Sequence, residues 1–511
     1  MTDSYSKSEP YSKSEQRRVI IISSLVTGAG FIDTTALNVA LPFIQKDLNA
    51  SAADAYWVLE VYLLGLAALL MAGGALGDSF GRRKPLFWGV GAFALTSLGC
   101  ALSQDASALI FFRALQGIAA AVMIPASLAL INASFSPEER GAAIGRWSAL
   151  VSLTIPLGPL FGGLSVDVLT WHIIFWVNVP LCLLVLFLMR KLRRPPFEPP
   201  RTVPLDLVGS VAVTISLGLI TYALMEAGRK GAFSPLHTQL LIAGIITFGL
   251  FLYSQTKLKR PMIPPHLFKD RRFIIVNLHT LFLFASFQSA TFFLSFMLIQ
   301  SYGYGATAAG AAALPISILV TLLSRYAGQW TSQKGPKHIL VASSILLGAA
   351  LTAMSYTNGL YWQSLFVPMI LIGLGVAAFA APVTTVAMVS AGPGRDGLAS
   401  GVNNAVARIG PLLAIAAFGY VMAFDFEAQL LSHPAFLALD APYQAFMGGH
   451  LNELGGMVLP DDWPADIADK AQTAISESYA NSVKKILIYC AFLMGICAIF
   501  SLCYRREDAV E

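Results

Sequence analysis

Three ionisable side chains, Asp33, Glu60 and Arg113, stand inside long apolar stretches in the first part of this chain. Such groups within membrane hydrocarbon are costly unless they are paired or hydrated, so they are functional candidates. At 1.5 Å per residue they lie about 13, 8 and 9 Å below the same predicted membrane surface. We expect a charge cluster in which Arg113 holds one acid ionised and burial favours protonation of the other. An acid alternately exposed to two sides could carry protons; a structural salt bridge is the alternative.

The composition indicates that a membrane replaces water around most of the chain. Hydrophobic residues make up 56% of the 511 residues and charged residues 12%, and the mean hydropathy is +0.66. This leaves too little polar surface to cover a soluble globule. The net charge of +5 is small, and the bases cluster in short segments between apolar runs. That distribution favours contact with a membrane face and not with nucleic acid.

The apolar stretches predict an all-α polytopic membrane protein, because a helix needs about 20 mostly apolar residues to cross a bilayer. Fourteen membrane helices are expected by this measure. Their ranges are 19–42, 55–77, 85–104, 107–133, 141–166, 171–190, 206–226, 237–256, 272–300, 306–330, 338–356, 361–390, 397–423 and 482–504.

The chain contains an internal repeat. A polar hairpin from Gly74 to Lys84 returns as the segment from Gly328 to His338, with the same spacing between its glycines. Ser332 replaces the acid found at Asp78 in the first copy. Parallel repeats of six helices around a site at mid-membrane are an architecture of secondary transporters.

The repeat and the charge distribution together predict the domain organisation. Most of the 34 bases fall in segments on the side of the N-terminus, which predicts that both termini are cytoplasmic. The long segment at 424–481, on the outer side of the membrane, is expected to be a solvated loop. The alternatives are a surface helix in its later part, a cap over the outer mouth or a contact with a partner. The expected units are an N-terminal tail (1–18), a six-helix bundle (19–190), linkers with two inserted helices (191–271), a second six-helix bundle (272–504) with the outer loop at 424–481, and a C-terminal tail (505–511).

The first four expected helices of the second half lack acids, but this half offers other polar and aromatic side chains. No Asp or Glu occurs between Phe273 and Arg395, so proton coupling through core carboxylates must use the first half. His279 could titrate near neutral pH, although a hydrogen-bonded core histidine is the favoured reading. The candidates for a substrate cavity are Phe284, Phe287, Gln288, Asn404 and Arg408. For Asn404 and Arg408 the alternative is that they form hydrogen bonds with backbone carbonyls.

Several function classes find no support in the sequence. The five cysteines form neither a disulfide framework nor a CxxC pattern, and the histidines form no HxxxH pair, so we expect no metal site. No GxxxxGKS motif for nucleotide phosphates is present, so ATP-driven transport is not encoded in this chain. We expect no enzyme activity and no cofactor other than a proton gradient.

Four motifs resemble those of the major facilitator superfamily, specifically its fourteen-helix drug/proton antiporters. They are the segment from Phe31 to Pro42, the hairpin from Gly74 to Lys84, the segment from Arg113 to Gly117 and the segment from Gly158 to Gly163. The resemblance covers almost the whole chain. Two features depart from it: the loop Trp171-His-Ile173, where members commonly have Trp-Arg-Trp, and Glu60, where they usually have a small polar residue.

The resemblance implies two conformational elements. The first is a cytoplasmic latch made by Gly74, Asp78, Gly81 and Arg82, with Asp78 placed near the start of the thirteenth helix, where a carboxylate suits the helix dipole. The second is a moving seam, in which glycines permit close approach and proline bends the backbone. The seam residues are Gly158, Pro159, Gly162 and Gly163, for which static close packing is the alternative.

The resemblance also implies a function, written here as an expectation. The chain is expected to be a proton-coupled antiporter of the bacterial inner membrane that exports lipophilic or cationic compounds, as multidrug exporters do in antibiotic resistance. Export of an endogenous lipid or metabolite is one alternative, and a non-transporting receptor or assembly subunit is another. The expected partners are protons, a small lipophilic substrate and the lipid bilayer, with a periplasmic adaptor left open.

Overall fold

The fold is taken from a computed structural model that describes residues 11–152, 154–193, 206–230, 232–258, 261, 263, 265–390 and 396–504. Within these residues the chain is helical and contains no strand. Some side chains inside helices, including that of Asp78, lie outside the described part.

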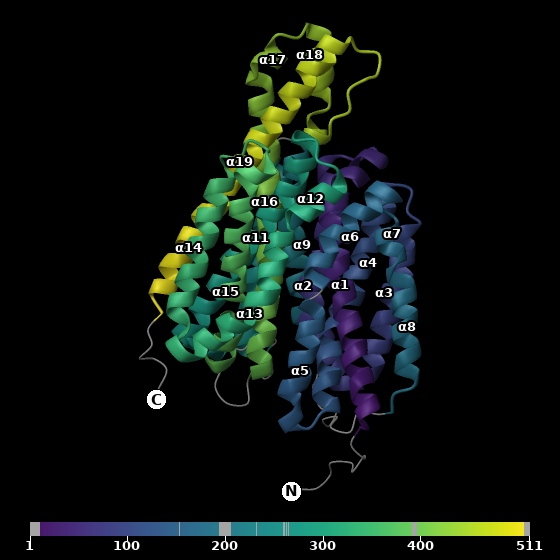
Figure 1. Ribbon diagram of the computed structural model, residues 1–511, viewed down its shortest axis with the longest axis vertical. Coiled ribbons are helices and arrows are strands. Elements are labelled where there is room, and N and C mark those ends of the chain that lie inside the picture. Colours follow the sequence, from purple (N-terminus) through teal and green to yellow (C-terminus); the bar gives the residue numbers. More distant parts are fainter. Residues whose placement is uncertain are drawn as a thin grey trace.

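The first half is a bundle of helices joined by short turns (Figure 1). Several helices begin at polar caps. At the start of α2, for example, the Ser51 hydroxyl accepts a hydrogen bond from the backbone N–H of Asp54, and the Asp54 carboxylate accepts one from the backbone N–H of Ser51. The helices are α1 (Lys13–Asp47), α2 (Ala52–Phe80), α3 (Arg83–Ala101), α4 (Ala106–Ser134), α5 (Pro137–Ser152), α6 (Thr154–Val168), α7 (Ile173–Trp176) and α8 (Asn178–Arg190).

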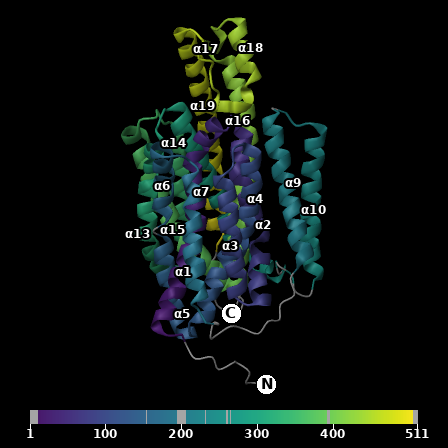
Figure 2. The same ribbon diagram turned by 90° about the vertical axis from the view of Figure 1, so that its right-hand side faces the viewer.

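Two further helices lie between the halves in sequence, α9 (Leu207–Arg229) and α10 (Pro235–Lys257). Helix α9 packs against α2 of the first half and α16 of the second, while α10 packs on α9. In Figure 2 the pair stands at the edge of the molecule. A short 3₁₀ helix, η1 (Pro265–Lys269), leads into the second half.

The second half repeats the architecture of the first and adds a helical extension. Its membrane-type helices are α11 (Arg271–Phe296) with the π-helical turn η2 (Met297–Ser301), α12 (Ala306–Ala312), α13 (Leu314–Lys334), α14 (Pro336–Met354), η3 (Tyr361–Leu365), α15 (Phe366–Ser390), α16 (Asp396–Ser432) and α19 (Ala465–Leu502). The extension adds α17 (Pro434–Leu437), α18 (Ala441–Gly449) and η4 (Leu451–Gly456).

The predicted class is confirmed: the chain is an all-α polytopic membrane protein. Twelve helices of the described part are long and apolar enough to cross a membrane, and Leu157–Val168 is a shorter apolar helix. Helices overlap each of the expected ranges, but the count of fourteen stays a prediction. Helix α1 begins and helix α19 ends at one end of the bundle, which we call the termini end, and the extension stands at the opposite cap end (Figure 1).

The repeat is visible in the backbone. Gly81, at the end of α2, has φ 85° and ψ 157°, and Gly335, before α14, has φ 80° and ψ 163°. This region is essentially accessible to glycine alone. Both copies of the hairpin therefore turn in the same way, although only the first carries the acid.

The segment at 424–481 is largely helical, so the alternative of a helix in its later part is confirmed and the expectation of a loop throughout is corrected. Helix α16 runs on to Ser432, and α19 begins at Ala465 and continues without a break into the last membrane-type helix. The two extended helices are joined by polar contacts: Asp425 accepts from Lys485 at 2.5 Å and from Ser482 at 2.8 Å. These contacts and the ring contact between Phe426 and Tyr479 keep the chain helical beyond the apolar stretch.

Candidate functional site

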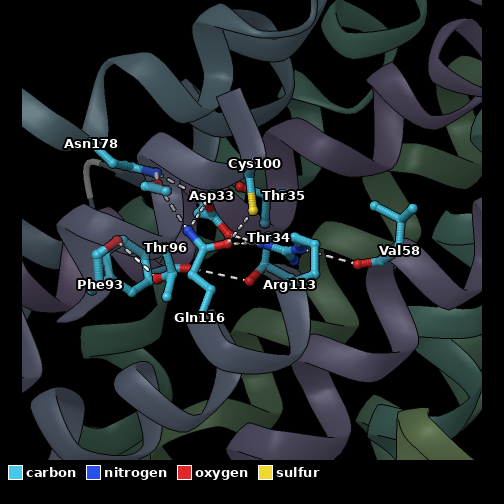
Figure 3. A network of polar contacts seen from close by, with 12 residues as sticks. Asp33, Thr34, Thr35, Val58, Phe93, Thr96, Cys100, Arg113, Gln116 and Asn178 are labelled. Carbon is cyan, nitrogen blue, oxygen red and sulfur yellow. Dashed lines mark hydrogen bonds and ion pairs between the residues drawn. The ribbon is translucent and has the colours of Figure 1, made fainter. Parts of the chain in front are cut away.

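A buried ion pair joins Asp33 of α1 to Arg113 of α4 (Figure 3). The Arg113 Nη1 atom donates to the Asp33 carboxylate at 2.5 Å, and both side chains have no exposed surface. The Arg113 Nε atom donates to the carbonyl oxygen of Val58 on α2 at 3.0 Å. The structure thus brings together two of the three residues expected in the cluster.

Amide side chains complete the shell around Asp33. Gln116 of α4 and Asn178 of α8 each donate to its Oδ1 atom, at 3.1 and 3.0 Å. Both amides also donate to the hydroxyl of Ser97 on α3. Sequence reasoning missed these residues, although Gln116 stands one helical turn after Arg113, a spacing that places both on one face.

The cluster draws its members from four helices, α1, α3, α4 and α8, and α2 contributes a carbonyl oxygen and an aromatic ring. The Arg113 guanidinium lies over the Tyr62 ring, 4.2 Å from its centroid. Close approach of α2 and α4 makes this contact feasible, because a Cβ atom at Gly117 would collide with the Tyr62 backbone. Each oxygen of the Asp33 carboxylate accepts at least one hydrogen bond, as a buried ion pair requires.

Glu60 does not join the cluster. Its side chain is fully buried, and neither carboxylate oxygen has a hydrogen-bond partner among the described residues. Val58 and Tyr62, which face α4, lie about 200° around the α2 axis from Glu60 at 100° per residue. Burying a polar group without a hydrogen-bond partner is costly, which makes Glu60 a candidate for a functional role.

The residues expected in the second half lie on α11 and α16. Phe284, Phe287 and Gln288 are half-buried, and Phe284 packs edge-on against Phe379 of α15. On α16, Asn404 is exposed. Its neighbour one turn on, Arg408, is half-buried and reaches across to α1 of the first half, where its guanidinium carbon lies 5.5 Å from the Phe31 ring centroid.

His279 is a core histidine, the favoured reading of the sequence. Its Nδ1 atom lies 2.7 Å from the Ser501 hydroxyl and 3.1 Å from the Cys497 sulfur, and the ring stacks on Phe379. Its Nε2 atom has no partner in the part of the chain that the structure describes.

The glycines of the predicted seam divide between two contacts. Cβ atoms at Gly158 and Gly162 would collide with Thr35 and Ala36 of α1, so these glycines bring α6 onto α1 within the first half. A Cβ atom at Gly163 would lie 2.5 Å from the carbonyl oxygen of Ala306, and the Pro159 backbone abuts Gly310. These last contacts join α6 to α12, across the two halves.

Polar contacts at the cap end reinforce this junction. The Asp167 carboxylate, at the end of α6, accepts backbone N–H groups of Ala306 and Thr307 at 3.2 and 2.8 Å, so it caps the N-terminus of α12. Gln45 of α1 accepts from Gln300 at 3.1 Å and donates to the carbonyl oxygen of Glu453 at 2.9 Å. The halves are closed against each other at this end.

The predicted latch is described only in part. Gly74 lies within α2, Gly81 ends it with the turn given above, and Arg82 follows, half-buried. The side chain of Asp78 and the surroundings of Gly397 are outside the described residues, so the latch stays a prediction.

Fold and site define a class of protein: a polytopic helical membrane protein of two repeated bundles, with a buried ion pair in the first bundle. The profile of the Major Facilitator Superfamily matches residues 23–415. The chain belongs to this family, whose members are transporters.

Relatives in this family are named for drug resistance. The chain is 31% identical over 421 residues to the multidrug resistance protein Stp of Mycobacterium tuberculosis (strain CDC 1551 / Oshkosh), covering 81% of this chain and 78% of the relative. It is 32% identical over 412 residues to the puromycin resistance protein pur8 of Streptomyces alboniger, covering 79% and 81%. It is 31% identical over 401 residues to the tetracenomycin C resistance and export protein of Streptomyces glaucescens, covering 77% and 73%.

Solved structures share the fold. A bacterial homologue of the human lysosomal transporter Spinster, in an inward-facing and occupied conformation, aligns with a TM-score of 0.67 over 96% of this chain and 97% of the other, at 17% identity. The unoccupied inward-facing form of that homologue aligns with a TM-score of 0.66 over the same shares, also at 17% identity.

Proposed function

We propose that this protein is a proton-coupled antiporter that exports small lipophilic compounds by alternating access. The proposal rests on two acids, Asp33 and Glu60, that are expected at similar depth in the membrane but have different surroundings. Asp33 is ion-paired and hydrogen-bonded, whereas Glu60 is buried with both oxygens unpartnered. Drug-resistance names among the relatives support export of foreign compounds.

The mechanism uses the difference between the two acids. When the seam between the halves opens at the cap end, water reaches buried groups and lowers the penalty for ionising them. A proton taken up on that side and released on the other would be carried inward while substrate leaves. The proton gradient is thus the energy source, and the protein holds the proton on a carboxyl oxygen of Asp33 or Glu60.

We place the protein in the bacterial inner membrane with both termini in the cytoplasm. The base-rich segments support this orientation. In this orientation the contacts at the cap end would close the outer side. Asp78 and Arg82 would latch the inner side in the opposite state.

The test is transport in proteoliposomes containing the full chain. Efflux of a trapped fluorescent dye cation such as ethidium, and of dansylaminoundecanoic acid, is followed with and without a pH gradient, and a trapped pH dye records proton movement. The gradient should accelerate efflux, and Asp33→Asn should abolish that acceleration. Glu60→Gln shows whether the second acid also couples. Glu226→Gln, at a surface ion pair on α9, is the matched control.

Proton coupling would be ruled out if efflux of both dyes were the same with and without the gradient and if the parent chain behaved like Asp33→Asn. The carboxylate would then be a structural element of the first half. Facilitated transport of a lipid or metabolite would be the reading that remains.

A further inference from the structure

Arg408 is a cation between the two halves that has no ion-pair partner among the described residues. Its guanidinium carries five N–H donors, and the ring that it contacts is that of Phe31. It lies in the middle of α16 and keeps part of its surface exposed. An unpaired charge at membrane depth is costly, so its presence calls for a partner that arrives from outside the chain.

Among the residues that the structure describes, no acid fills this role. The second half has no Asp or Glu at 273–395, 397–424 or 482–504, the ranges that hold its membrane-type helices. In the first half Asp33 is already bound by Arg113 and two amides. Glu60 is fully buried and makes no contact with a base among the described residues.

Tyr62 of α2 supplies a hydroxyl to the same region. Its side chain is fully buried, and its hydroxyl lies next to Thr34. The Tyr62 ring lies under the Arg113 guanidinium, and the tyrosine is also within electrostatic range of Arg408.

We infer that Arg408, with the Tyr62 hydroxyl and the Phe31 ring, is the recognition site for an amphipathic organic anion, such as a lipophilic carboxylate or phenolate. This inference rests on the proposed function and names the substrate class of that export site. The planar guanidinium binds a carboxylate through two parallel N–H donors, the tyrosine hydroxyl adds a third, and the Phe31 ring packs against the apolar body.

The charge of the site also discriminates against the opposite class of compound. A lipophilic cation would meet an uncompensated guanidinium in a region of low dielectric, where like charges repel strongly. Asp33, one of the acids that suggested cationic substrates from the sequence, is already bound by Arg113 and two amides. The inferred site at Arg408 favours anions.

The experiment measures equilibrium binding with two probes that differ only in the charged end. Dansylaminoundecanoic acid carries a carboxylate, and its counterpart carries a trimethylammonium group on the same dansyl-labelled chain. Both are titrated by fluorescence into the full-length protein in nanodiscs of zwitterionic lipid, with empty nanodiscs subtracted. The anionic probe should bind at least about 10-fold more tightly than the cationic one.

Variants then assign the preference to Arg408. Arg408→Gln should weaken binding of the anionic probe by about 10- to 100-fold, and binding of the cationic probe should be unchanged or tighter. The affinity of Arg408→Lys for the anionic probe should lie between those of the parent chain and Arg408→Gln. Tyr62→Phe should weaken binding of the anionic probe by a smaller factor than Arg408→Gln does, and it should not change binding of the cationic probe. Arg229→Gln, at the surface ion pair of α9, is the matched control and should change neither probe. If Arg408→Gln does not fold, the ratio of the two probes on the parent chain and Arg408→Lys still carry the test.

Equal binding of the two probes, or tighter binding of the cation, would overturn the inference, as would an Arg408→Gln protein that binds the anion like the parent. The guanidinium would then be a structural brace against Phe31. These outcomes are separate from a failure of proton coupling, because binding is measured without a gradient and coupling is read from the Asp33→Asn transport assay.

Discussion

The crossing of α6 and α12 at Gly163 should act as a switch between open and closed states at the cap end. In Gly163→Ala the new methyl group would lie 2.5 Å from the Ala306 carbonyl oxygen and 2.6 Å from the Thr307 Cα atom. Both distances are far below van der Waals contact, and both partners are backbone atoms that cannot rotate away. Overpacking of this kind costs about 1–3 kcal/mol.

That penalty falls only on the state in which α6 and α12 touch. Once the halves separate at the cap end, the methyl group meets no backbone, so the substitution shifts the equilibrium towards the open state by about 5- to 150-fold. The contacts of Asp167 with the N-terminus of α12 would be lost in the same movement.

The assay is a distance measurement by double electron–electron resonance. Spin labels are attached at Gln104→Cys, in the turn after α3, and Tyr356→Cys, in the turn after α14, both exposed and at the cap end. The exposed native Cys503 is first replaced by serine. Gly163→Ala should move the population to longer distances, whereas Gly91→Ala, whose added Cβ would have no atom within 4 Å, should not. Identical distance distributions for the two alanine variants would refute the steric argument.

Two further predictions concern stability. Asp33→Asn should lower the thermal stability of the purified protein by about 3–5 kcal/mol because it leaves Arg113 buried without a counter-charge. Adding Arg113→Gln should recover part of that loss, and two additive losses would mean that the residues are energetically independent. Gly81→Ala and Gly335→Ala should each cost about 1–3 kcal/mol, since both glycines need a backbone conformation that alanine avoids. Melting temperatures no lower than that of Gly91→Ala would contradict this.

The elements predictable from sequence were those that depend on one helix at a time. The length of the apolar stretches predicts the helices. The positions of Asp33 and Arg113 within these stretches predict similar depths in the membrane for the two side chains. Their meeting is confirmed by the 2.5 Å contact. The glycine spacing of the hairpin predicts the repeat, which appears as matching backbone angles at Gly81 and Gly335.

Depth alone could not show which way a side chain faces. Glu60 stands at the level of Arg113 but on another side of α2, so equal depth did not bring it into the cluster. Helical phase would have warned of this, since Val58 and Tyr62 contact α4 and Glu60 lies far around the axis from both. Asn178 could not be found at all, because its place beside Asp33 depends on how α8 packs against α3.

The end of an apolar stretch was also a poor guide to the end of a helix. Helices α16 and α19 continue beyond the membrane-type segment because each supplies the other with polar partners, as Asp425 and Lys485 show. Composition predicts where a helix leaves the lipid. Whether it then stops depends on contacts with a segment about 60 residues away in the chain.

The separation of the two charged sites constrains how proton and substrate would be coupled. In an antiporter whose substrate is a cation, the two ions can compete for one acid. Here an anion at Arg408 would not touch Asp33, which has no exposed surface and already accepts hydrogen bonds at both oxygens. Direct competition for a carboxylate therefore cannot link them. The link must run through the movement of the halves, with Tyr62 as the side chain that interacts with both Arg113 and Arg408. An anion that orders Arg408 against α1 would draw the second half onto the first, and the same movement would decide when water reaches the acids of the first half.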